Sequence, residues 1–135
     1  MTENNYYNTF IEVAEDCPAT TGLIPEPYRG RRTVAMLQYD LMKHAYALTQ
    51  EDVLYQTEAL TKGYAPHQEI ERRAAFFSVP RACLRSSPLP KKYGWGIHFD
   101  AQGYGALVAV DAPEYQELKN DPGLKHVKAL RTNKK

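Results

Sequence analysis

The side chains best suited to chemistry in this chain lie between residues 81 and 98, where four cations and one histidine occur without any acid. Arginine can bind a carboxylate or phosphate through two parallel hydrogen bonds, and lysine adds a point charge. His98 could act as an acid or base, or donate to an anion, because the pKa of an imidazole lies near neutrality. We therefore expect an anion-binding site that comprises Arg85, Lys91, Lys92, Tyr93, Gly94, Gly96 and His98.

The spacing within residues 93–99 explains why this stretch could form a site. Side chains alternate between the two faces of a strand. One face of the predicted strand would carry only aromatic and aliphatic side chains, and the other only Gly94, Gly96 and His98. Glycine inside a strand often marks the close approach of a ligand or of other backbone. The pattern predicts an open sheet face near His98, rimmed by the cations that precede it.

Simpler interpretations stand beside this site. His98 could be a hydrogen-bonded histidine in a subunit interface, and the preceding cations could be solvated loop charges. Cys83, flanked by Arg81 and Arg85, could serve as a nucleophile with His98 as its base. Its two immediate neighbours in the chain are apolar, however, and they favour a buried structural thiol.

Metal, cofactor and nucleic-acid binding are not predicted. Glu12, Glu15 and Asp16 form an acidic cluster, but the four histidines lack the spacing of metal ligands. The pair Gly94 and Gly96 lacks the third glycine of the dinucleotide fingerprint and leads into a strand rather than a helix. Aromatic residues alternate with bases here, as in single-strand binders, but they fall on the face assigned to the core.

Apolar periodicity and capping signals indicate the elements that would position these residues. Residues 8–14 alternate as a first strand, and the proline- and glycine-rich segment Glu15–Arg32 is predicted to be a long loop. Thr33 can cap a helix whose apolar stripe extends to Leu48. A loop of this length within a small domain is often functional or mobile.

Two further helices are predicted before the cations. Thr49 with Asp52 resembles a capping box, and Gly63 supplies a natural stop. Pro66 begins the third helix, and a loop over residues 88–90 is expected after it. The residues that share the apolar face of this third helix are Ile70, Ala74 and Phe77.

The C-terminal part favours a hairpin, a short helix and a final strand. Asp100–Gly103 is typical of a hairpin turn between strands at 93–99 and 104–110. Asp111 can cap the short helix, and residues 124–131 alternate as the last strand. The order of elements predicts an α+β fold, specifically a ferredoxin-like βαββαβ plait with an enlarged helical first crossover and an antiparallel sheet.

Size and composition suit one domain over residues 1–135, with 43% hydrophobic and 24% charged residues. The net charge of +1 gives no general attraction to nucleic acid or to an anionic membrane. No apolar run reaches the roughly 18 residues that a membrane span needs. The N-terminus lacks the pattern of a signal peptide, so we expect a cytoplasmic protein with reduced cysteines and a frayed Lys134–Lys135 tail.

Three parts of the chain resemble a family of short uncharacterised bacterial proteins. They are TFIEVAEDCP at Thr9–Pro18, SPLPKKYGWGIHFD at Ser87–Asp100, and EYQELKNDP with VKALR at Glu114–Pro122 and Val127–Arg131. Together they span nearly the whole chain, and the central one is the most specific. The resemblance implies a bacterial single-domain protein of unknown function, and it carries no catalytic residue over to this chain.

Three functions remain open from the sequence. The first is a small binding module, without a cofactor, that takes an anionic small molecule or an acidic segment on the open sheet face. The second is a small enzyme that uses His98 as general acid or base, with Arg85 or a lysine steadying a developing negative charge. The third is a purely structural homodimer whose interface contains Gly94, Gly96 and His98.

Overall fold

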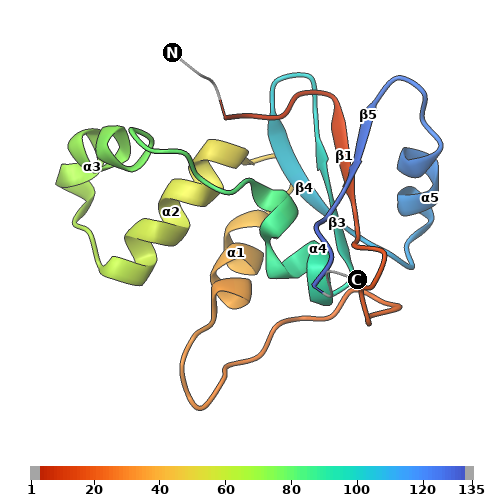
Figure 1. The fold of residues 1–135 in the computed structure, drawn as a ribbon, viewed down its shortest axis with the longest axis horizontal. Helices are drawn as coiled ribbons and strands as arrows, with labels where there is room; N and C mark the ends of the chain where they lie inside the picture. The colour runs from red at the N-terminus through yellow and green to blue at the C-terminus, as the bar shows by residue number, and fades with distance from the viewer. Residues whose placement is uncertain (1–3, 133–135) are drawn as a thin grey trace.

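A five-stranded mixed sheet with helices on both faces is the frame of the computed structural model, which describes residues 4–132 (Figure 1). β3 pairs antiparallel with both β1 and β4, and β2 pairs antiparallel with β4. β5 runs parallel to β1 at the opposite edge. In the spatial order β2-β4-β3-β1-β5, the strands are β1 Thr9–Glu12, β2 Leu48–Thr49, β3 Trp95–Phe99, β4 Tyr104–Ala109 and β5 Lys125–Lys128.

The α+β class is confirmed, but the predicted antiparallel sheet is wrong at the edge formed by β5. The helix α5, Pro113–Lys119, crosses over the sheet between β4 and β5, so these two strands point the same way. Such a crossover is the ordinary way to join strands of equal direction. In a ferredoxin-like plait the second strand of the hairpin would lie beside the first strand of the sheet. Here β3, the first strand of the hairpin, pairs with β1, so β5 is parallel to β1 and the ferredoxin-like plait is not confirmed.

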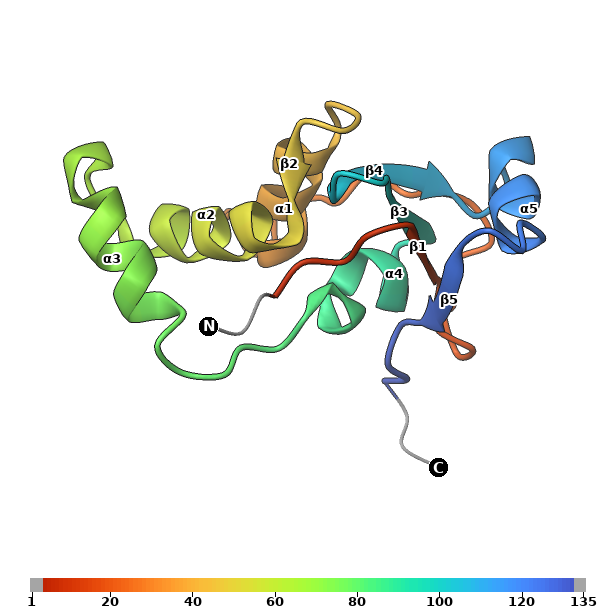
Figure 2. The same ribbon diagram turned by 90° about the horizontal axis from the view of Figure 1, so that it is seen from above.

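The remaining helices precede the hairpin in the chain. They are α1 Val34–Met42, α2 Gln50–Lys62, α3 Glu69–Phe76 and α4 Pro88–Lys92, with 3-10 turns η1 Pro66–Gln68 and η2 Leu84–Ser86. Figure 2 shows α2 and α3 extending away from the sheet as an arm. No helix among residues 4–132 is long and apolar enough to cross a membrane.

Capping explains where the helices begin and end. The hydroxyl of Thr49 accepts a hydrogen bond from the amide of Asp52 at 3.2 Å, and the Asp52 carboxylate accepts one from the amide of Thr49 at 3.0 Å. This reciprocal pair confirms the predicted capping box, and α2 ends at Gly63 as predicted. α1 ends at Met42, so the predicted stripe is too long: Leu48 belongs to β2.

The loop predicted over residues 88–90 is a short helix instead. The Ser87 hydroxyl accepts a hydrogen bond from the amide of Leu89 at 3.2 Å, and Pro88 occupies the first helical position. Proline is favoured there because its missing N–H has no helical partner in any case. α4 therefore leads directly into the glycine-rich strand β3.

The two faces of the sheet bury cores of unequal size. The larger core lies beneath the helical layer, and the smaller one lies beneath α5 and includes Phe10, Val108 and Tyr115. The residues buried in the larger core are Ile11, Ala14, Met42, Val53, Leu84, Ile97, Phe99 and Ala129.

The long loop predicted over Glu15–Arg32 folds back along the start of β3. The amide of Leu23 donates to the carbonyl of Tyr93 at 2.8 Å, and the indole nitrogen of Trp95 donates to the carbonyl of Leu23 at 2.7 Å. Residues 24–32 then project beyond the helices (Figure 1). The tail at Lys134–Lys135, which we expect to fray, lies outside the described residues.

Candidate functional site

The two glycines of the predicted open face are buried by the chain itself. Gly94 has φ +78°, and a Cβ there would lie 2.1 Å from the carbonyl oxygen of Thr21. At Gly96 a Cβ would lie 2.8 Å from the Tyr115 ring and 3.0 Å from the Phe10 ring. The prediction of an open face is therefore wrong at both positions, because the long loop covers one glycine and α5 the other. What approaches the glycines is protein rather than ligand.

His98 is half-buried on the same face of the sheet. Its Nδ1 lies 2.8 Å from the hydroxyl oxygen of Tyr46, within hydrogen-bond distance. Burial lowers the pKa of His98, and the nearby carboxylates of Asp100 and Asp121 oppose that shift in part. Burial also raises the pKa of Tyr46, with a further rise from Asp100. The imidazole is thus neutral near pH 7 and held by a protonated phenol.

The predicted cations are not gathered around His98. The Nε of Arg85 donates to the carbonyl of Lys128 at 2.6 Å, on the helical side of the sheet where Leu84 enters the larger core. Lys91 and Lys92 lie in α4, and Tyr93 is the residue that ends that helix rather than a strand residue. Ligand binding by these residues stays a prediction, but the sheet separates Arg85 from the imidazole.

Cys83 lies beside Tyr6 rather than beside a histidine. The Tyr6 hydroxyl donates to the Cys83 sulfur at 3.4 Å. Burial, assisted by this contact, raises the pKa of Tyr6 to about 12. Cys83 and Cys17 are both free. Among residues 4–132, no cluster of three or more histidines, cysteines or acids could hold a metal ion.

A groove of about 820 Å³ lies between the start of α2, the helix α3 and residues 77–80. The apolar residues of α3 that the sequence predicts on one face line it, and Ile70 among them is 87% exposed. The face is uncovered because α3 packs on α2 through a different side chain, Phe76, whose ring contacts Tyr55 edge to face. The residues that line the groove are Asn4, Glu51, Glu69, Ile70, Arg73, Ala74, Phe77, Ser78, Val79 and Pro80.

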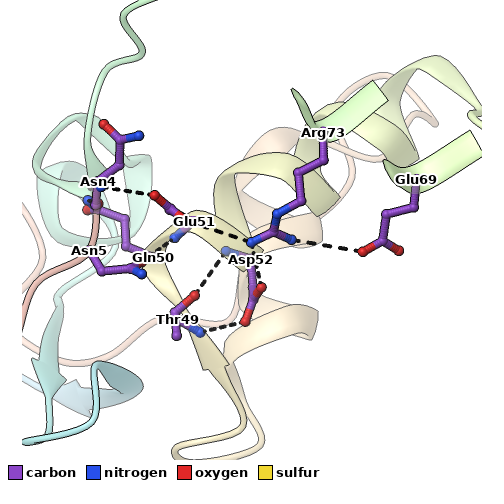
Figure 3. Close-up of polar contacts among 8 residues, drawn as sticks. All are labelled: Asn4, Asn5, Thr49, Gln50, Glu51, Asp52, Glu69 and Arg73. Atoms are coloured by element: carbon purple, nitrogen blue, oxygen red, sulfur yellow. Dashed lines mark hydrogen bonds and ion pairs between the residues drawn. The ribbon is translucent and has the colours of Figure 1, made fainter. Parts of the chain in front are cut away.

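One guanidinium lies among three carboxylates at the rim of this groove (Figure 3). Arg73 donates to Asp52 at 2.9 Å and lies 4.0 Å from both Glu51 and Glu69. Burial would raise the pKa of Asp52, but hydrogen bonds from Thr49 and Arg73 outweigh it and hold that pKa below its usual value. One guanidinium is therefore shared by three carboxylates, and the cluster has an excess of acidic groups.

The N-terminal segment fixes the start of α2 against the groove (Figure 3). The amide of Asn4 donates to the Glu51 carboxylate at 2.9 Å, and the amide of Glu51 donates to the side chain of Asn5 at 2.9 Å. Gln50 is buried, donates to the carbonyl of Asn4 and accepts from the amide of Leu84 at 2.9 Å. Each of these bonds joins parts of the chain far apart in sequence, so this wall of the groove is held in place before any ligand arrives.

This groove is not among the sites that the sequence predicts. The apolar face of Ile70, Ala74 and Phe77 was visible in the helical spacing, and an arginine three residues after Ile70 was a further signal. The local sequence does not predict that Glu51 and Asp52 lie beside Arg73. This contact depends on the direction of the turn between α2 and α3, which the sequence pattern does not give.

Fold and groove together define a small α+β protein with a preformed, acid-rimmed apolar groove on a two-helix arm. The chain belongs to a family of unknown function, DUF6157, whose sequence profile matches residues 1–135. This confirms the resemblance to an uncharacterised family over the whole chain. No curated protein and no solved structure matches the chain.

Proposed function

We propose that this protein is a binding module that uses the groove between α2 and α3 to hold a short segment of apolar and basic side chains. The observation that carries the proposal is the uncovered apolar face at Ile70, Ala74 and Phe77. Contiguous apolar surface on a soluble protein commonly marks a site of interaction. The volume of about 820 Å³ lies within the range of roughly 300–1,000 Å³ that is typical of ligand pockets.

The charges at the rim favour a ligand with positive charge. With Arg73 engaged by Asp52, the carboxylates of Glu51 and Glu69 face the groove without a full counter-charge. A guanidinium or ammonium group of the ligand could pair with the exposed Glu69 carboxylate on the side away from Arg73. An anionic ligand would be repelled, since like charges at an interface disfavour the wrong partner. Apolar burial would supply affinity, and the rim would supply specificity.

A pair of synthetic peptides tests this function. Both carry the same tyrosine and isoleucine residues, with arginines at the polar positions of one and glutamates at those of the other. Fluorescence anisotropy should show binding of the arginine peptide alone. Ile70→Glu should weaken it about tenfold or more, the loss typical of a central contact.

Leu60→Glu is the matched control, because Leu60 is 54% exposed on α2 and does not line the groove. This variant should bind the arginine peptide as the wild-type protein does. Equal binding of both peptides, or equal loss in Leu60→Glu and Ile70→Glu, would refute the groove as the site.

The sequence-derived alternatives stay predictions. These are an anion site around Lys91 and Lys92, catalysis by His98, and a bacterial and cytoplasmic origin. Of these, the His98 alternative has one supporting observation, the neutral imidazole held by Tyr46. A second, smaller crevice of about 110 Å³ lies beside Trp95.

A further inference from the structure

The loop over residues 24–32 ends in a tight, basic turn. The amide of Tyr28 donates to the carbonyl of Arg31 at 2.9 Å, and the amide of Arg31 donates back at 3.0 Å. The two central residues, Arg29 and Gly30, have φ of +51° and +74°, which is the pattern of a type I′ hairpin turn. The left-handed conformation is ordinary for glycine but disfavoured for arginine. We name residues 28–31 the basic tip.

The basic tip offers apolar and cationic groups without internal partners for its charges. Tyr28 is 63% exposed and the nearby Ile24 is 68% exposed. The guanidinium of Arg29 lies 5.2 Å from the centre of the Tyr28 ring. Within residues 4–132, Arg32 pairs with Asp40, whereas neither Arg29 nor Arg31 forms an ion pair.

The basic tip has the composition that the groove is proposed to select. The tip presents an aromatic ring and two guanidinium groups without ion pairs, and the groove presents apolar side chains beside two carboxylates, Glu51 and Glu69, that share one arginine with Asp52. Opposite potentials of this kind favour association and fix its register. In Figure 1 the loop that carries the tip extends below α1, whereas α3, which lines the groove, lies at the upper end of the arm, so the tip lies away from the groove of its own chain.

We propose that the groove holds the basic tip of a second copy of this chain. The inference rests on the proposed function and names its ligand. The Tyr28 ring would pack on Ile70 and Phe77 of the other copy, with Arg29 beside the exposed carboxylate of Glu69, on the side away from Arg73. The tip and the groove are different surfaces, so each contact joins unlike parts of the two copies. If a two-fold axis relates the copies, each inserts its tip into the groove of the other. Otherwise the copies associate head to tail.

Two variants that each lose one half of the contact provide the test. The tip variant Arg29→Glu with Arg31→Glu keeps its groove, and the groove variant Ile70→Glu keeps its tip. Sedimentation velocity over a range of concentrations should show self-association of the wild-type protein and a monomer for each variant alone. A mixture of the two variants should again form a complex with one partner of each kind, through the one intact contact.

Lys119→Glu on α5 reverses a charge outside the tip and the groove, and this control should associate as the wild-type protein does. Wild-type association should also weaken at high salt, because the rim charges are partly exposed. A wild-type monomer at every concentration would overturn the inference, as would association that both variants leave unchanged. If the protein is monomeric but the arginine peptide still binds the groove, the inference fails and the proposed function stands.

Discussion

Gly94 shows how one residue joins the long loop to the sheet. Its φ of +78° is left-handed, and a Cβ would lie 2.1 Å from the carbonyl oxygen of Thr21. This is a steric clash with backbone, which cannot rotate away as a side chain can. Gly94→Ala should therefore lower the free energy of unfolding by about 2 kcal/mol or more.

Gly30→Ala is the matched control, since its φ is +74° but no atom lies within 4 Å of the added Cβ. The free energy of unfolding of this variant should fall by about 1 kcal/mol, because alanine is strained in the left-handed conformation. Urea unfolding followed by the fluorescence of Trp95 measures both losses. Equal losses in the two variants would show that the loop does not hold the place described.

The spacing of the glycines predicts that other groups come close to the strand, but it does not predict which groups. Gly94 and Gly96 do mark close approaches, which the sequence predicted. The approaching groups come from Thr21 and Tyr115, which lie far away in sequence and become neighbours only once the loop and α5 have packed. A local pattern can indicate that space is needed without indicating what fills it.

His98 should give the protein a measurable dependence on acidity. Its pKa in the unfolded chain is about 6.5, and burial lowers it in the folded protein, with Asp100 and Asp121 opposing. Below about pH 6.5 the unfolded chain therefore binds more protons than the folded one. The free energy of unfolding should fall as the pH drops from about 6.5 through the lower folded pKa of His98.

His98→Gln should lose less stability than the wild-type protein over this acidic range, as thermal unfolding at a series of pH values would show. His44→Gln, at an exposed position after α1, serves as the control and should keep the wild-type pH profile. If the profiles of His98→Gln and the wild-type protein coincide, the burial of this imidazole contributes nothing to stability.

At the scale of elements, α5 is held to the sheet by Tyr115. Its ring meets the Phe10 ring edge to face at a centroid distance of 5.0 Å, and its hydroxyl accepts a hydrogen bond from the amide of Val13 at 2.9 Å. Tyr115→Phe leaves that amide without its partner and should cost about 1–2 kcal/mol of unfolding free energy.

Tyr104→Phe is the matched control, because Tyr104 is an exposed residue of β4 whose hydroxyl has no such role in the described structure. It should change the free energy of unfolding by less than about 0.5 kcal/mol. Chemical denaturation compares the two variants directly. If Tyr115→Phe left the free energy of unfolding unchanged, the hydroxyl would not hold α5 to the sheet.

The third helix shows what periodicity can and cannot predict. The spacing correctly placed Ile70 and Ala74 on one face of α3, although the helix ends at Phe76, before Phe77 and the predicted end near Pro80. Whether such a face is buried depends on the neighbouring element, and here Phe76 makes the packing contact with Tyr55 instead. The groove is therefore a property of how α2 and α3 are joined, which no single-helix pattern contains.

For the whole molecule, element types were more predictable than their arrangement. Both strands of the hairpin, the capping box at Thr49 and the helix before β5 follow from local signals. The direction of β5 relative to β1 does not, because it depends on which strand of the hairpin pairs with β1, and the predicted antiparallel sheet failed there because β3 takes that place. The fold class came from the order of elements, whereas the groove and the basic tip required their positions in space.

The molecule as a whole carries two complementary surfaces on different sides, an acidic apolar groove and a basic apolar tip. This pairing accounts for an exposed Ile70 and an arginine held in a left-handed turn with one explanation. It also gives a reason for the arm of α2 and α3 to extend from the sheet, since a groove at the end of an arm can be reached by another chain.

The most direct measurement is a titration of isotope-labelled protein with the arginine peptide, followed by the backbone amide chemical shifts. We predict shifts in the groove, led by Ile70, Ala74 and Phe77, with shifts of the basic tip as the peptide displaces a second copy. Shifts centred on Lys91, Lys92 and His98, or no shifts at all, would contradict the account and return the search to the glycine-rich strand.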